Sequence, residues 1–178
     1  MKILIMCEGS NEQKIMQILL KNNCLNFSED DVLSLEPIHA RQINKSSMVK
    51  LALNSYPGEV IVYRIGDKQS DKLIIPKEYK DKITRVEKYC TKPELEMLLI
   101  IAENLTTTYE KVKSSMKPKD FAKKYIKCGK HKYDNSTVFY DEFFSNNPQL
   151  LVESIRAYRK YNGSHKKDEH YLEELLID

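Results

Sequence analysis

The chain has 178 residues, 41% of them hydrophobic and 31% charged, so it can form a buried core beneath a very polar surface. Its formal net charge of +3 is too small to indicate a polyanionic partner by itself. No window approaches the roughly 18 uninterrupted apolar residues of a membrane-spanning helix, and the N-terminal segment lacks a signal-peptide pattern. We therefore expect a cytoplasmic protein with no membrane partner.

The first ninety residues alternate between strand-like and helix-like segments. Runs of apolar and β-branched residues predict strands at residues 2–7, 30–38, 59–67 and 81–90. Apolar residues at helical spacing predict helices at 11–23 and 46–56. Strands that alternate with helices are typical of a parallel sheet with helical crossovers. We expect an α/β fold in which helices flank a four-stranded, mainly parallel sheet.

From residue 93 onward the pattern becomes helical. Helices are predicted at residues 93–105, 117–127, 147–161 and 168–178. The composition shifts near residue 104, which indicates an α/β core over 1–104 and a helical, basic extension over 105–178 that packs on the core.

Acidic residues follow three of the predicted strands. They are Glu8 and Glu12 after the first strand, Asp67 and Asp71 after the third, and Glu94 and Glu96 after the fourth. Ligands of parallel α/β sheets bind outside the carboxyl ends of the strands, so these carboxylates are expected to converge on one rim. Converging acids raise one another's pKa or bind a divalent cation. Oxygen ligands suit Mg²⁺, Mn²⁺ or Ca²⁺ rather than zinc.

Several of these acids also have a purely structural explanation. Glu12 falls in the first turn of a predicted helix, where the helix dipole favours an acid. Asp67 follows Gly66 and fits an ordinary turn. Glu94 and Glu96 cannot both face the rim from one helix, since neighbours two apart diverge by about 200°.

Three short motifs resemble those of TOPRIM domains, the metal-binding α/β modules of topoisomerases, primases and OLD-type nucleases. Glu8-Gly9-x-x-Glu12 resembles their opening motif, and Asp67 at the end of an apolar strand resembles the start of their Asp-x-Asp motif. The segment PELEMLL at 93–99 resembles the Pro-x-x-Glu-x-Trp-Leu segment of small stand-alone RloB-like TOPRIM proteins. That group is often found in defence or mobile-element loci. The resemblance covers residues 1–105.

The resemblance implies a Rossmann-like TOPRIM fold with an acidic Mg²⁺ or Mn²⁺ site for phosphodiester chemistry. It implies that Glu8 is the catalytic residue and a metal ligand, with Asp67 and Glu96 as further ligands. Glu12 has a supporting place in the same motif.

One position departs from the family pattern. The second acid of Asp-x-Asp falls at Gln69, whose amide oxygen binds a divalent cation less strongly than a carboxylate. Asp71 is the candidate to replace it as a metal ligand, with Gln69 in a supporting role. If Asp71 does not do so, the site binds metal poorly or is inactive.

The second half contains a dense basic segment. Residues 111–132 hold nine lysines and one acid. The lysines expected to contact a nucleic-acid backbone are Lys117, Lys119, Lys123, Lys124 and Lys127. The alternative is an ordinary solvated surface. Phe121 and Tyr125 share a helix face, where base stacking and core packing are the two explanations.

We therefore expect a Mg²⁺-dependent nuclease, or a related hydrolase of phosphodiester bonds, that acts on DNA or RNA in a defence or mobile-element system. The alternative is a non-catalytic nucleic-acid- or protein-binding module with a degenerate TOPRIM site, which Gln69 favours. Either agrees with a homodimer or with a partner protein from a neighbouring gene.

Overall fold

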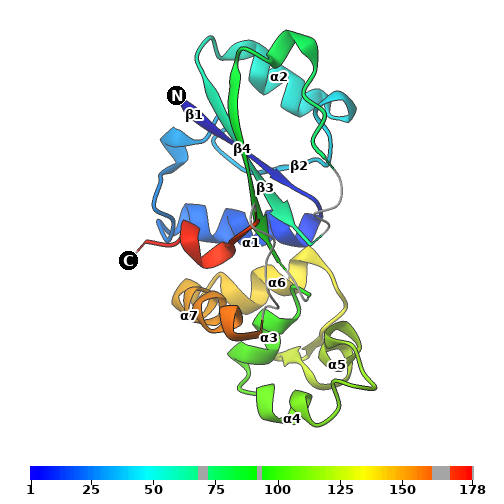
Figure 1. Ribbon diagram of the computed structural model, residues 1–178. Coiled ribbons are helices and arrows are strands. Elements are labelled where there is room, and N and C mark those ends of the chain that lie inside the picture. Colours follow the sequence, from blue (N-terminus) through cyan, green and yellow to red (C-terminus); the bar gives the residue numbers. More distant parts are fainter. Residues whose placement is uncertain (68–71, 92–93, 162–168, 178) are drawn as a thin grey trace.

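A parallel β-sheet forms the centre of the protein (Figure 1). The structure is a computed structural model that describes residues 1–67, 72–91, 94–161 and 169–177. In these ranges the sheet has five strands in the order β2-β1-β3-β4-β7, and every neighbouring pair is parallel. The strands are β1 (Lys2–Cys7), β2 (Ile38–His39), β3 (Val60–Gly66), β4 (Ile83–Cys90) and β7 (Glu169–Tyr171). The expected α/β fold with a parallel sheet is confirmed, whereas the expected number of four strands is wrong.

Helices cover both faces of this sheet. They are α1 (Ser10–Lys21), α2 (Ser47–Ser55), α3 (Met97–Ala102), α4 (Thr106–Glu110), α5 (Pro118–Tyr125), α6 (Thr137–Phe144) and α7 (Pro148–Tyr158). A short antiparallel hairpin of β5 (Lys127–Cys128) and β6 (His131–Lys132) lies between α5 and α6 in the chain. Across the described ranges, none of the helices combines the length and the apolar composition needed to cross a membrane.

Alternating side chains of the strands divide the core in two. Leu4 and Met6 of β1 belong to the core under α2, whereas Ile5 and Cys7 belong to the larger core on the other face. Side chains of α1, α3, α5, α6 and α7 complete the larger core. In Figure 1, α2 lies at one end of the view and the C-terminal helices at the other, with the sheet and α1 between them.

The segment 30–38, expected as a strand, pairs with β1 mainly at Ile38–His39. Residues Glu29–Asp31 instead form a short 3-10 helix. Its cause is local, because the Asp31 carboxylate accepts hydrogen bonds from the backbone N–H and the hydroxyl of Ser28, each at 2.8 Å. Such side-chain bonds to nearby backbone compete with strand pairing.

The helix expected at 168–178 is wrong. Within that segment, Glu169–Tyr171 form β7, which pairs with Lys88–Cys90 of β4, and Leu172–Leu175 form a 3-10 helix. Leu172 and Leu175 are buried in the larger core. The leucine spacing reflected burial, but pairing with an open sheet edge determined the backbone conformation.

The expected helices at 117–127 and 147–161 are confirmed as α5 and α7. The helix expected at 93–105 is shorter than predicted, because α3 begins only at Met97. Helix α7 packs against α1 and α3, and β7 extends the sheet, so residues 105–178 contribute to both layers of the fold.

Candidate functional site

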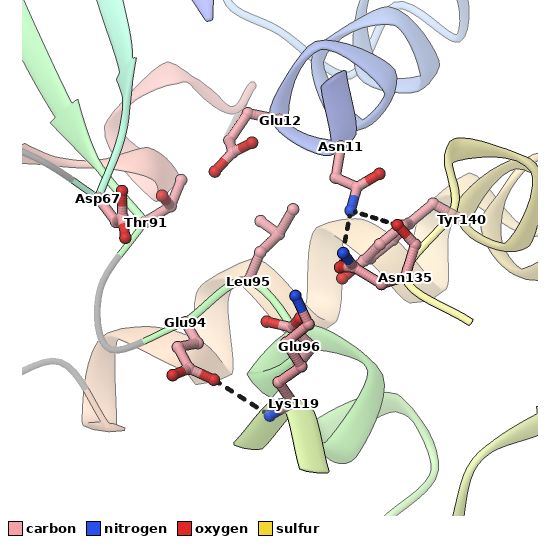
Figure 2. Close-up of a pocket in the computed structure, with 10 residues that line it drawn as sticks. All are labelled: Asn11, Glu12, Asp67, Thr91, Glu94, Leu95, Glu96, Lys119, Asn135 and Tyr140. Carbon is pink, nitrogen blue, oxygen red and sulfur yellow. Dashed lines mark hydrogen bonds between the residues drawn. The ribbon is translucent and has the colours of Figure 1, made fainter. Parts of the chain in front are cut away.

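A pocket of about 300 Å³ lies beyond the carboxyl ends of β3 and β4, beside the first turn of α1 (Figure 2). Its lining residues are Asn11, Glu12, Asp67, Thr91, Glu94, Leu95, Glu96, Lys119, Asn135 and Tyr140. Four of these described residues are acids and one, Lys119, is a base. The structure therefore brings carboxylates from three separate segments to one place.

Side-chain alternation along the strands explains why Asp67 reaches the pocket. Ile65 of β3 and Tyr89 of β4 pack in the core on the α1 side of the sheet. Asp67 and Thr91 each follow two residues later, so they continue on that same side. The pocket opens on the α1 side for this reason.

Glu8 has a different position, and its residue is not part of the pocket lining. It continues the alternation of Leu4 and Met6, which face α2. Its side chain lies against Gly66, and its carboxylate forms an ion pair with Arg64 at 3.6 Å between Oε1 and Nη2. Glu8 and Arg64 are each 5% exposed. Both therefore form a buried pair under the end of β3.

The backbone of Glu8 is also held by side chains. Its carbonyl oxygen accepts hydrogen bonds from Arg41 Nε at 3.1 Å and from His39 Nε2 at 3.2 Å. In the structure they fix the turn between β1 and α1.

Glu12 faces the pocket from the first turn of α1 (Figure 2). Burial raises its pKa, and the negative charges of Asp67, Glu8 and Glu96 raise it further. A carboxylate in this environment gains from any cation that approaches it. Its position is thus more than that of a first-turn acid interacting with the helix dipole.

Glu96 is 7% exposed and belongs to a polar network on the far side of the pocket. Its Oε1 accepts a hydrogen bond from the Tyr133 hydroxyl at 2.8 Å. The same hydroxyl lies 3.3 Å from that of Tyr140 and 3.0 Å from Asn135 Oδ1. Asn11 Nδ2 donates to the backbone carbonyl of Asn135 at 3.2 Å. This network links the first turn of α1 to the segment before α6.

Replacing Tyr133 by phenylalanine is expected to destabilise the protein by about 1.5–3 kcal/mol, since it removes a hydrogen bond to a buried carboxylate. Chemical denaturation of both proteins measures the difference in the free energy of unfolding. Tyr125→Phe is the matched control: Tyr125 is 46% exposed, so a change within about 0.5 kcal/mol is expected. Equal losses in the two variants would contradict the proposed contribution of the bond to Glu96.

Glu94 borders the pocket at the N-terminus of α5. Its Oε2 accepts a hydrogen bond from the backbone N–H of Lys119 at 3.1 Å. Burial raises the pKa of Glu94, and this bond counteracts the increase. The expected divergence of Glu94 and Glu96 is wrong, because both precede α3 and so are not constrained by helical spacing.

The described residues contain no group of three or more His, Cys, Asp and Glu side chains placed to hold a metal ion. The expected combination of Glu8, Asp67 and Glu96 therefore does not form such a centre. Gln69 and Asp71 lie outside the described residues.

The expected nucleic-acid contacts lie on and around α5. Lys119 lines the pocket, and the exposed members of the set are Lys117, Lys123, Lys124 and Lys127. Phe121 is fully buried, which agrees with core packing. Tyr125 is exposed, and the centroid of its ring lies 4.6 Å from that of the Phe121 ring. Lys124 Nζ lies 5.1 Å from the centre of the Tyr125 ring.

Several pocket residues were not expected from the sequence: Asn11, Thr91, Asn135 and Tyr140. Lys119 was expected to contact nucleic acid but not to line the pocket. Thr91 had a usable signal, because it follows β4 as Asp67 follows β3. Asn135 and Tyr140 come from a distant segment, and local sequence patterns do not indicate that contact.

Comparisons of the chain with protein-family models, with curated proteins and with solved structures found no match. The five-stranded parallel sheet flanked by helices is compatible with a Rossmann-like fold. The TOPRIM resemblance thus depends on the three short motifs.

Proposed function

We propose that this protein is a Mg²⁺- or Mn²⁺-dependent enzyme that cleaves phosphodiester bonds in DNA or RNA. The observation that carries the proposal is the pocket in which Glu12 and Asp67 come together beyond the strand ends, with Lys119 in the same lining. An acidic pocket next to a lysine-rich surface suits an anionic substrate that binds together with a cation.

The residues of the pocket fit such a cation. Carboxylate oxygens are its preferred ligands, and the raised pKa of Glu12 marks negative charge that a cation would compensate. Mg²⁺ is commonly held by one or two carboxylates together with waters and substrate phosphates. Glu12 and Asp67 would hold it here, so a group of three acids is not required. When bound, it would supply neutralisation of the charge on a phosphate.

The lysines around α5 support the choice of substrate. Lys117, Lys123, Lys124 and Lys127 are exposed, so their ammonium groups are free to meet a phosphate backbone. Lys119 connects that surface to the pocket. A nucleic acid lying along α5 would bind mainly through its phosphates, and the binding would weaken as salt rises.

Glu12→Gln and Asp67→Asn are each expected to reduce cleavage by about 100-fold or more, as changes near metal ligands already cost 10–100-fold. Plasmid DNA and single-stranded RNA are incubated with Mg²⁺ or Mn²⁺, and the products are quantified with and without a chelator. Glu78→Gln, an exposed acid of the 3-10 helix at Lys77–Tyr79, is the control and should cleave at the parent rate.

A non-catalytic binding module is the second candidate, in the same pocket. It is favoured by the pairing of Glu8 with Arg64 and by the lack of a three-acid group among the residues described. Salt-sensitive binding of nucleic acid that a chelator does not change, without cleavage of either substrate, would decide for this candidate.

A further inference from the structure

Thr91 is held in place through its backbone at the end of β4. Its N–H donates to the carbonyl oxygen of Gly66 at 3.2 Å, and its own carbonyl accepts a hydrogen bond from the Tyr158 hydroxyl at 2.7 Å. The residue is 1% exposed. Strand β3 on one side and α7 on the other therefore fix the direction of its side chain.

Among the described residues, the backbone N–H and carbonyl of Thr91 have hydrogen-bond partners, whereas its side-chain hydroxyl does not. This hydroxyl is buried. A buried hydroxyl without a partner costs free energy that a methyl group in its place would not. A bound water or cation next to the hydroxyl would remove this cost.

The position of this hydroxyl indicates the ligand. Thr91 lines the pocket together with Glu12 and Asp67, and Figure 2 shows it beside Asp67. The other two acids of the pocket already accept hydrogen bonds, Glu94 from Lys119 and Glu96 from Tyr133. Thr91 follows Cys90 on β4 as Asp67 follows Gly66 on β3, and Gly66 and Cys90 are paired, so the two residues lie at neighbouring strand ends.

We propose that Thr91 Oγ1 is a neutral ligand of the cation that Glu12 and Asp67 hold. The inference rests on the proposed function and adds a residue to its site. Hydroxyl oxygens of Ser and Thr serve as Mg²⁺ ligands in other phosphate-handling proteins. Two carboxylates balance the charge of a divalent cation, and a neutral third ligand completes its coordination without adding charge that repels phosphate.

Thr91→Val tests the inference by removing the hydroxyl at nearly constant size. Mn²⁺ affinity, measured by titration calorimetry without substrate, is expected to fall by about tenfold, while Thr91→Ser retains the parent affinity. The metal-free Thr91→Val protein should melt at the same temperature as the parent or higher, because an unsatisfied buried hydroxyl is gone. Adding Mn²⁺ should then raise its melting temperature less than it raises that of the parent.

Two controls make the result decisive. Thr84→Val, an exposed position near the start of β4, should bind Mn²⁺ like the parent. Thr91→Ala is a second hydroxyl-free variant, which should lose affinity even if valine disturbs packing. Parent-like affinity in both hydroxyl-free variants would overturn the assignment of Thr91 but leave the proposed function intact. A parent protein that does not bind Mn²⁺ at all would overturn both.

Discussion

Glu8→Ala is expected to destabilise the protein by about 3–5 kcal/mol, because it removes one partner of a buried ion pair. The other partner is Arg64, 5% exposed and 3.6 Å from the Glu8 carboxylate. Such a loss is a large part of the roughly 5–15 kcal/mol by which a domain of this size is stable. Urea denaturation, analysed for both midpoint and slope, measures it.

Glu12→Gln provides the contrast. The raised pKa of Glu12 means that the folded state disfavours its charged form, so a neutral amide should keep or increase stability at neutral pH.

The double replacement Glu8→Leu with Arg64→Met should recover much of the loss caused by Glu8→Ala, since apolar pairs often replace buried ion pairs without cost. Equal stability of Glu8→Ala and the parent would show that the pair contributes little.

Because Glu8 variants are expected to be unstable, their loss of activity has two explanations. Loss of cleavage in a Glu8 variant would follow from unfolding as well as from a catalytic role. Variants of Glu12 and Asp67 avoid that ambiguity, because neither takes part in the ion pair with Arg64. Activity assays of Glu8 variants therefore need a parallel measurement of the folded fraction.

Gly66→Ala is expected to destabilise the protein by about 1–3 kcal/mol through overpacking. A Cβ atom there would lie 2.3 Å from Glu8 Oε2 and 2.4 Å from Glu8 Cγ. The Glu8 side chain cannot move aside without disturbing its contact with Arg64. A glycine-to-alanine change that the backbone tolerates stabilises a protein by about 0.4–1 kcal/mol. At Gly66 we expect the overpacking against Glu8 to outweigh that gain.

Gly9→Ala is the matched control for Gly66→Ala. Its Cβ would meet only the side chain of Glu12, with Oε2 at 2.4 Å, and this flexible end borders the open pocket. The backbone of Gly9, at φ −130°, accepts any residue. Thermal and urea denaturation should therefore show a clear loss for Gly66→Ala and almost none for Gly9→Ala. Similar losses at both positions would contradict a special role for the Glu8 contact.

The sequence predicted the sheet core better than the site, and the strands show why. Alternation in residues 2–7 and 59–67 already separates Glu8 from Asp67, because each continues a different face of the sheet. What the sequence cannot provide is which face carries the pocket, since that depends on where α1 and α6 pack. The expected grouping of Glu8 with Asp67 and Glu96 is wrong for this reason, since β1 directs Glu8 to the α2 side of the sheet.

The missed residues of the pocket have the same explanation. Asn135 and Tyr133 reach Asn11 and Glu96 only through packing of α6 on α1, and no local pattern encodes that contact. The C-terminal segment illustrates the converse. Its leucines are spaced as in a helix, but pairing of Glu169–Tyr171 with β4 provides the backbone hydrogen bonds instead.

The pairing of β7 with β4 also has a consequence for how the protein folds. Its two strands are far apart in the chain, so joining them closes a long loop whose entropy must be overcome before the contact stabilises anything. We expect this edge to form late. Until it does, the β4 edge at Lys88–Cys90 is open to another incompletely folded molecule, which can add a strand there. We therefore expect pairing with β7 to protect the β4 edge, next to Thr91, from aggregation during folding.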